Sequence, residues 1–378
     1  MAGAKQAELL AIRLPAEQAA GAVLDAWTRR QPVAVLDPNA PDAATAHARA
    51  ALRLDAPVDP SVAAVVVTSG TTAQPKAVEL TWAGLECMAS GFSAAIGADP
   101  ATDRWLVCLP VHHVAGLAIL ARAWVSGVPV TAHSGFDIDR VADAPEKSGA
   151  TLVSLVPTML KRLLDAEPDT LARFRCVVLG GARTPTALRR RAVDTGAAFF
   201  DAYGLSETWG GCVINGRAIT GVDARLDDSG GIIVRGPVVM RGYRGDPDAT
   251  TAAFTADGWL RTGDAGVLDD DGRIVVVDRA RDLIITGGVN VSPTAVEEVL
   301  IRHPAILDVC VVGVPDDEWG QRVVAHVVAQ PASAPPTLDE LRAFAAHDLS
   351  AAQLPREVRA RTEIPRSSSG KALRRLVT

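Results

Sequence analysis

Between residues 60 and 205 the chain alternates short apolar runs with longer segments in which apolar residues recur at helical spacing. The apolar runs are rich in β-branched residues and predict buried strands at 62–67, 105–110, 128–131, 151–156, 176–179 and 198–200. The longer segments predict helices at 82–96, 140–148, 157–165 and 187–195, with a further apolar helix after residue 117. Strands and helices in this alternation predict an α/β sheet with right-handed crossovers.

The two ends of the chain follow different patterns. Residues 5–27 are Ala-rich and predict one or two amphipathic helices broken near Pro15, followed by a connection with a short strand at 33–36. Residues 213–278 carry short β runs separated by Gly/Asp turns, which predict a small barrel or a second sheet. After residue 280 the pattern predicts a smaller α+β unit, with helices at 293–302 and 338–347 and strands at 307–314 and 322–329.

We therefore expect an α/β fold in two domains. The first, residues 1–278, is large, with packed sheets and helices and a β-rich subdomain. The second, residues 279–378, is a small α+β domain. A chain of 378 residues in which 48% are hydrophobic is long enough and apolar enough to build a core in each.

Charge and cysteine usage exclude several classes of function. The net charge of −6 argues against a general nucleic-acid or anionic-membrane binder. The longest apolar stretch, 114–130, is interrupted by Arg122 and two glycines, so a membrane span is not expected, and no secretory signal is visible. The five cysteines are scattered without metal-ligand spacing, as in a cytoplasmic protein with reduced thiols.

The stretch from Thr68 to Val78 follows the apolar run 62–67 and is the strongest candidate for chemistry. It reads Thr-Ser-Gly-Thr-Thr-Ala-Gln-Pro-Lys-Ala-Val, so hydroxyls, a glycine and Lys76 follow one strand end. Such a loop offers N–H groups, hydroxyls and a cation to phosphate oxygens. By itself it is also compatible with a surface turn, and it lacks the spacing of a Walker A loop.

Three further segments point to a nucleotide. In Asp201–Thr208, Tyr203 can lie flat against a base, Gly204 permits a tight turn, and Glu207 is a natural Mg²⁺ ligand, although Ser206-Glu207 could also simply begin a helix. Glycines 180 and 181 follow a predicted strand, which alone indicates only a turn. Asp264, in the segment 258–264, could accept both ribose hydroxyls or be a turn aspartate.

Taken in order, these residues resemble the acyl-adenylate-forming enzymes: acyl-CoA synthetases, adenylation domains of peptide synthetases and firefly-type luciferases. Five segments match the family, namely 68–78, 201–208, 258–264, 278–291 and 365–371, the last with the sequence Pro-Arg-Ser-Ser-Ser-Gly-Lys. The chain departs from the family at Ala73, Ala77 and Asp278, where glycine is usual, and at Arg281, where Asp or Lys is commoner. Its beginning is also short, which implies a reduced N-terminal subdomain.

The resemblance implies a role for each matching residue. Lys371, Lys76 and Thr208 would be catalytic, with Lys371 delivered by a second domain that swivels about residues 278–282. Gly287 and Gly288 would line the CoA channel, and Glu207 would hold Mg²⁺. The residues implied in ATP binding are Thr68, Ser69, Gly70, Thr71, Thr72, Gly180, Gly181, Ala182, Asp201, Tyr203, Gly204, Asp264 and Arg279.

The implied reaction joins a carboxylic acid to a thiol in two steps, with ATP, Mg²⁺ and coenzyme A. Residues 109–122 are similar to the corresponding segment of o-succinylbenzoate–CoA ligases of menaquinone synthesis, and His113 and Arg122 match while His112 and Ala115 depart. Arg122 would bind the second carboxylate of the acid, and His113, Gly204 and Ser206 would line its pocket. The alternative for Arg122 is an arginine at the exposed end of a helix.

Other functions stay open at this point. The chain could be another aryl- or acyl-CoA ligase with an apolar pocket, a non-catalytic nucleotide-binding relative, or a ligase that serves a carrier protein instead of CoA. The resemblance also leaves a homodimer open.

Overall fold

The computed structural model describes residues 7–68, 75–331, 333–366 and 372–377. The chain divides into two compact units, which are described separately below. Unit 1 comprises Met1–Arg225 and Ile233–Thr262, and unit 2 comprises Leu226–Ile232 and Gly263–Thr378. The predicted domain boundary at residues 278/279 stays a prediction.

The first sheet of unit 1 has seven strands in the order β11-β10-β9-β8-β7-β5-β6. Five of them pair in parallel: β5 (Trp105–Val107), β6 (Val130–Ala132), β7 (Leu152–Leu155), β8 (Cys176–Leu179) and β9 (Phe199–Tyr203). The hairpin of β10 (Val213–Ile214) and β11 (Arg217–Ala218) extends the sheet antiparallel to β9. The predicted alternation of strands and helices is confirmed here.

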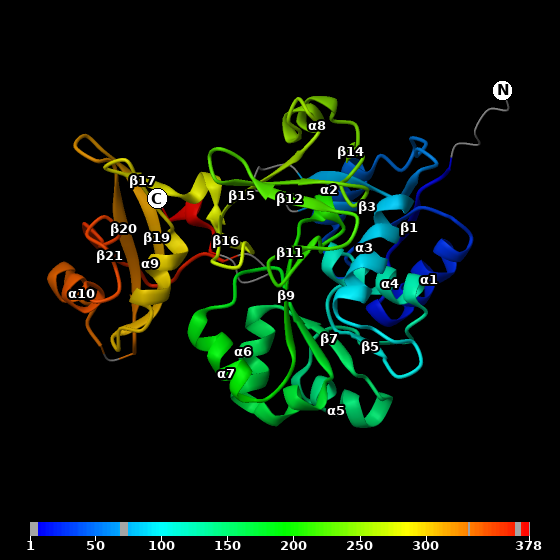
Figure 1. Cartoon of the computed structure of the whole chain (residues 1–378), viewed down its shortest axis with the longest axis horizontal. Coiled ribbons are helices and arrows are strands. Elements are labelled where there is room, and N and C mark those ends of the chain that lie inside the picture. Colours follow the sequence, from blue (N-terminus) through cyan, green and yellow to red (C-terminus); the bar gives the residue numbers. More distant parts are fainter. Residues whose placement is uncertain (1–6, 69–74, 332, 367–371, 378) are drawn as a thin grey trace. The chain divides into compact units, whose positions relative to one another are not determined.

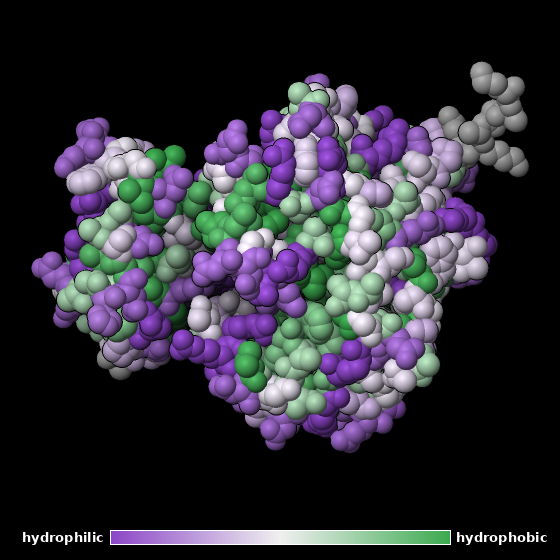
Figure 2. All heavy atoms as spheres, in the orientation of Figure 1, coloured by the Kyte–Doolittle hydropathy of each residue, from purple (hydrophilic) through white to green (hydrophobic). Residues whose placement is uncertain are grey.

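Helices α5 (Ile138–Ser148), α6 (Pro157–Ala166) and α7 (Thr186–Asp194) bury their apolar residues against this sheet in one core cluster (Figure 1). Leu160, Leu163 and Leu188 from the helices meet Val153 and Val177 from the strands. The outward faces of these helices carry many hydrophilic residues, as the lower edge of Figure 2 shows. Helices α3 (Trp82–Ala95) and α4 (Val114–Ser126) pack against one another elsewhere in unit 1.

The second sheet of unit 1 has the order β1-β2-β3-β4-β14. Its strands are β1 (Leu10–Ile12), β2 (Val33–Val35), β3 (Val62–Thr68), β4 (Lys76–Thr81) and β14 (Gly242–Tyr243). Strands β3 and β4 are antiparallel. Strand β3 ends at Thr68, and β4 begins at Lys76, which is the partner of Thr68 in the pairing. The strand after the hydroxyl-rich stretch was not predicted, because its apolar positions are few and it forms by pairing with β3.

The prediction of helices throughout residues 5–27 is wrong in its first half. Leu10–Ile12 forms β1, paired in parallel with β2, and Leu9 and Ile12 are buried. Helix α1 (Ala16–Thr28) begins just after Pro15, and α2 (Asp42–Leu52) occupies part of the expected connection. Pairing with a strand more than twenty residues away overrides the local helical preference of an Ala-rich segment, because propensity is a weak prior.

The predicted β-rich region contains a third sheet in the order β12-β13-β15-β16. Its strands are β12 (Asp223–Leu226), β13 (Gly231–Arg235), β15 (Leu260–Leu268) and β16 (Ile274–Arg279), and the short helix α8 (Pro247–Ala253) follows β14. The prediction of a second sheet in this region is therefore confirmed.

Unit 2 has its own sheet and core, in agreement with the predicted α+β unit. The sheet order is β18-β17-β20-β19, with β21 (Glu357–Ala360) also paired to β20. The other elements are β17 (Ile284–Thr286), β18 (Val289–Val291), α9 (Pro293–Leu300), β19 (Ile306–Asp316), β20 (Gly320–Ala329) and α10 (Leu338–Ala345). Both helices bury apolar residues against the sheet, among them Val296 and Leu341. Among the described residues, no helix is long and apolar enough to cross a membrane.

Candidate active site

Several predicted site residues of unit 1 lie at the carboxyl ends of the parallel strands. Residues 110–113 follow β5, Gly180–Ala182 follow β8, and Gly204–Thr208 follow β9. A Cβ added to Gly180 would lie 3.2 Å from the carbonyl oxygen of Ala202, so the loop after β8 lies close to the end of β9. Ligands of open α/β sheets bind at this edge.

The turn after β9 is built around Gly204 and Thr208. A Cβ at Gly204 would lie 2.6 Å from the backbone nitrogen of Gly211, so the close approach requires glycine there. The Thr208 hydroxyl is buried, accepts a hydrogen bond from the Leu205 N–H at 2.9 Å, and thereby closes the short 3-10 helix Ser206–Thr208. Ser206 and Glu207 do begin a helix, as the alternative interpretation predicted, but it is only this 3-10 turn. Both side chains are partly exposed.

Glu207 and Lys76 both contact Tyr243. The Tyr243 hydroxyl donates a hydrogen bond to Oε1 of Glu207 at 2.8 Å, and Nζ of Lys76 lies 4.5 Å from the centroid of the Tyr243 ring. The structure thus brings the predicted metal ligand and the predicted phosphate-binding lysine together on one side chain.

The donor set around Glu207 suits Mg²⁺ held together with a nucleotide. Among the described residues no cluster of three or more His, Cys, Asp or Glu side chains could hold a metal by itself. Mg²⁺ commonly takes one or two carboxylates and fills its other positions with phosphate oxygens and water. Glu207, with one oxygen held by Tyr243, fits that pattern as a single protein ligand.

Thr68 lies at the end of β3, and its hydroxyl donates to the carbonyl oxygen of Lys76 at 3.3 Å. The other residues expected in the phosphate loop, Ser69, Gly70, Thr71 and Thr72, lie outside the described residues, as does Lys371.

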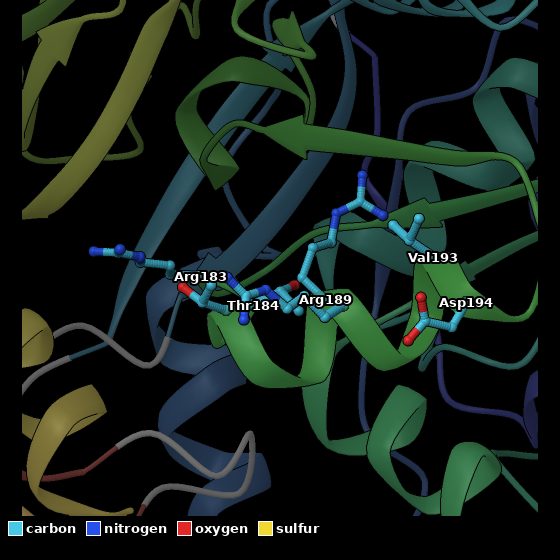
Figure 3. A pocket seen from close by; sticks show the side chains of 7 residues that line it. Arg183, Thr184, Arg189, Val193 and Asp194 are labelled. Carbon is cyan, nitrogen blue, oxygen red and sulfur yellow. The ribbon is translucent and has the colours of Figure 1, made fainter.

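On the predicted nucleotide side, Asp201 and Tyr203 lie on β9 next to the Gly180–Ala182 loop. The carboxylate of Asp201 is 3.1 Å from the Arg189 guanidinium on α7. Arg189 also lines a shallow hollow with Arg183, Thr184 and Asp194 (Figure 3). Arg183 and Arg189 extend in different directions in this view, so they do not converge on one point.

The remaining predicted ATP-binding residues lie in unit 2. Asp264 and Arg279 are opposite one another on β15 and β16, and Nε of Arg279 is 3.0 Å from Oδ1 of the buried Asp264. Gly287 and Gly288 form the turn between β17 and β18 with left-handed φ angles of 57° and 79°. Asp278, which departs from the family pattern, accepts hydrogen bonds from the Ser292 hydroxyl and the Thr294 N–H at the start of α9.

The two residues expected at the acid differ in their surroundings. His113 is exposed at the start of α4, and its ring centroid is 4.3 Å from that of His112. Arg122 is only 4% exposed, and its guanidinium carbon lies 3.9 Å from the centroid of the Phe92 ring and 4.9 Å from that of Trp105. The alternative that Arg122 sits at an exposed helix end is therefore wrong, because α4 turns this residue into the core.

Burial lowers the pKa of Arg122 to about 9. Its Nε donates to the Ala118 carbonyl at 3.0 Å, whereas its buried NH1 has no hydrogen-bond partner among the described residues. An unpartnered buried donor of this kind is costly unless an acceptor satisfies it. Its predicted role toward a carboxylate stays a prediction.

Sequence reasoning missed Tyr243, which lies outside every segment that was singled out. One signal could have found it: the chain has only two tyrosines, and the other, Tyr203, lies in a matched segment.

A lysine and a carboxylate that share one tyrosine, together with loops at the carboxyl ends of parallel strands, are compatible with the class of nucleotide-binding α/β enzymes. The family model of the AMP-binding enzymes matches residues 6–244, and that of the AMP-binding enzyme C-terminal domain matches residues 295–371. The chain belongs to the AMP-binding enzyme family, and its resemblance to the acyl-adenylate-forming enzymes is confirmed.

Several relatives of this chain within the family are named as ligases or synthetases that act on 2-succinylbenzoate, also called o-succinylbenzoate. The chain is 39% identical over 332 residues to a probable 2-succinylbenzoate–CoA ligase of Mycobacterium tuberculosis, covering 85% of each chain. It is 35% identical over 334 residues to the 2-succinylbenzoate–CoA ligase of Bacillus anthracis, covering 82% of this chain and 68% of that one. The o-succinylbenzoate–CoA synthetase of Bacillus subtilis, solved with its acyl-adenylate intermediate, superposes with a TM-score of 0.87 at 26% identity, covering 99% of this chain and 88% of that one.

Proposed function

We propose that this chain is an ATP-dependent acid–CoA ligase that converts o-succinylbenzoate to its CoA thioester in menaquinone biosynthesis. The observation that carries this is the likeness, over 99% of the chain, to a synthetase solved with the adenylate of that acid. The sequence relatives named 2-succinylbenzoate–CoA ligase support the same substrate.

The reaction has two steps. In the first, a carboxylate oxygen of the acid attacks the α-phosphorus of ATP, the bond to the bridging oxygen breaks, and pyrophosphate leaves. In the second, the CoA sulfur attacks the acyl carbon, the bond to the AMP oxygen breaks, and the thiol proton is released. A carboxylate is a poor electrophile, and the first step gives it a good leaving group.

The residues of unit 1 supply positioning and charge for the first step. Lys76, held over the Tyr243 ring, offers its ammonium group to the phosphates. Mg²⁺ bound to Glu207 would offset phosphate charge. Gly204 and Gly180 permit the close backbone approaches that hold the turn after β9 and the loop after β8, and Tyr203 would lie against the base. The roles of Ser69–Thr72 and Lys371, and the swivelling of the C-terminal domain, stay predictions from the resemblance.

A cytoplasmic location fits the cysteines, all five of which are free thiols. Assembly into a homodimer stays a prediction.

A panel of acids tests the function. Pyrophosphate release with and without CoA, and the thioester itself, are measured for o-succinylbenzoate and benzoate. We expect rapid turnover of o-succinylbenzoate and slow but measurable turnover of benzoate, which lacks the second carboxylate. Equal rates for the two acids would favour a general aryl-CoA ligase, and ATP binding without pyrophosphate release from any acid would favour a non-catalytic relative.

The Arg122→Met variant tests the pocket within the same panel. Loss of a charge-assisted hydrogen bond to the second carboxylate is expected to raise the KM for o-succinylbenzoate about tenfold or more. Benzoate, which lacks that carboxylate, is the matched control and keeps its wild-type rate. An equal loss for both acids would assign Arg122 to packing against Phe92 and Trp105 alone.

A further inference from the structure

The strand that carries Tyr243 places this residue beside Lys76. Strand β14 pairs antiparallel with β4, and Tyr243 lies opposite Val78. Lys76 is two residues from Val78 on the same strand, so its side chain emerges on the same face as Tyr243. The contact of the Lys76 ammonium with the ring therefore follows from the register.

The backbone around Tyr243 is held from both sides. The N–H of Met240 donates to the carbonyl oxygen of Glu207 at 2.8 Å, and the N–H of Arg244 donates to that of Ala77 at 2.8 Å. The N–H of Tyr243 itself donates to the Thr250 hydroxyl at 2.9 Å. Residues 240–244 thus link the Glu207 turn to the strand that carries Lys76.

The chemistry of a phenol suits the position beside Glu207. Its hydroxyl is a neutral donor that orients the carboxylate through Oε1 and leaves Oε2 for another ligand. A Lys or Arg in the same place would orient the carboxylate equally well, but its charge would repel a cation. Neighbours that orient a metal ligand typically change metal affinity by about 10–100-fold when they are removed.

The chemistry of the ring suits the position beneath Lys76. An ammonium group over an aromatic face is attracted to the ring quadrupole, yet it keeps its charge and its donors for an anion. The contact restricts the flexible lysine side chain before phosphate arrives, so less freedom is lost on binding.

We propose that Tyr243 is a positioning residue of this site, which sets Glu207 for the metal through its hydroxyl and Lys76 for the phosphates through its ring. This inference rests on the proposed function only in that both need a metal–ATP complex. Its test does not depend on which acid is used.

The test compares binding of ATP with and without a metal. Calorimetry gives the affinity for Mn²⁺–ATP and for ATP in EDTA, for the wild type, Tyr243→Phe and Tyr243→Leu. We expect Tyr243→Phe to weaken Mn²⁺–ATP about tenfold and to leave metal-free ATP unchanged, because only the hydroxyl is removed. Tyr243→Leu also removes the ring and is expected to weaken metal-free ATP as well.

A double-mutant cycle with Glu207→Gln locates the effect. If Tyr243 acts through Glu207, Tyr243→Phe adds nothing to the loss of Mn²⁺–ATP affinity in the Glu207→Gln background. Thr251→Val, which removes a hydroxyl from the neighbouring helix α8, is the matched control and keeps wild-type affinities. Urea unfolding of every variant separates lost affinity from lost stability.

Several results would overturn the proposal. The first is a double-mutant cycle in which Tyr243→Phe and Glu207→Gln lower the Mn²⁺–ATP affinity additively. The second is a Tyr243→Phe variant whose affinities for Mn²⁺–ATP and for metal-free ATP fall equally. The third is a wild type that binds no Mn²⁺–ATP. A wild type that binds Mn²⁺–ATP as expected but releases no pyrophosphate with any acid would instead contradict the proposed function and leave the role of Tyr243 intact.

Discussion

His326 shows how strongly one buried residue can depend on its surroundings. It lies fully buried on β20, and its Nδ1 accepts a hydrogen bond from Nε of Arg361 at 3.0 Å. Burial, followed by the positive charges of Arg361 and Arg359, lowers the pKa of His326 to about 4, although Glu357 acts in the opposite direction. The folded protein therefore keeps this imidazole neutral.

This lowered pKa makes the free energy of unfolding sensitive to acid. The unfolded chain takes up a proton near the ordinary histidine pKa of about 6.5, whereas the folded chain does so only near 4. Stability is then present above pH 6.5 and is lost as the pH falls toward 4. Between pH 7.5 and 5.0 we expect His326 alone to account for a loss of about 2 kcal/mol.

Urea unfolding at both pH values measures this loss. The His326→Gln variant keeps a hydrogen-bond acceptor for Arg361 but cannot titrate. Between pH 7.5 and 5.0 its free energy of unfolding should therefore fall by about 2 kcal/mol less than that of the wild type. The exposed His47, replaced in the same way, is the control and should keep the wild-type difference. An identical pH dependence for His326→Gln and wild type would contradict the assignment.

At the scale of elements, the turn after β9 decides where Tyr203 and Glu207 point. Gly204 has no left-handed φ, but a Cβ there would lie 2.6–2.8 Å from the backbone atoms of Gly210 and Gly211. Backbone cannot move aside as a flexible side chain can, so the two chain segments would have to separate. The geometry of the turn and of the loop 210–211 therefore depends on the absence of a side chain at residue 204.

Gly204→Ala is expected to cost about 1–3 kcal/mol of stability and to weaken ATP binding, because the strain falls on the turn that carries Glu207. Urea unfolding and calorimetric ATP titration measure the two effects. Gly21→Ala is the matched control: it lies in α1 with no atom within 4 Å of the added Cβ, and it should stabilise the chain by up to about 1 kcal/mol. Wild-type ATP affinity in Gly204→Ala would show that the turn tolerates the change.

At the scale of the whole of unit 1, Arg244 joins segments that are far apart in the sequence. Its guanidinium donates to Oε1 of Glu79 on β4 at 2.8 Å, and both side chains are buried. The other donors reach the carbonyl oxygens of four residues just before β3, namely Leu52, Arg53, Ala56 and Pro57. One side chain directly after β14 thus donates to a buried carboxylate and to carbonyl oxygens at the end of α2.

Arg244→Met should therefore cost about 3–5 kcal/mol, because it leaves Oε1 of the buried Glu79 and several carbonyl oxygens without their donor. The Arg241→Met variant is the control, since Arg241 contacts the same Glu79 at 2.8 Å but is half exposed, and it should cost less than about 1 kcal/mol. Urea unfolding compares them. Arg244→Lys should not restore stability, because an ammonium group lacks the five donors of a guanidinium. Equal losses of stability in Arg244→Met and Arg241→Met would contradict this account.

Much of the architecture could be read from local patterns. The β-branched runs at 62–67 and 176–179 became β3 and β8, and the helices around them lie within a few residues of their predicted ends. The segments that were missed or mistaken, β1, α2 and β4, carry weak local preferences, and two of them are strands stabilised by pairing with distant neighbours.

By itself, the sequence determined the order of the elements, the family and the identity of Lys76 and Glu207 as candidate ligands, because these depend on residues adjacent in the chain. Only the tertiary structure decided that Tyr243 joins them, that Arg122 is buried against aromatic rings and that Arg244 pairs with Glu79. The Tyr243–Glu207 and Arg244–Glu79 contacts span 36 and 165 residues of chain. No local pattern encodes such a contact, since it exists only after separate strands and helices have packed against one another.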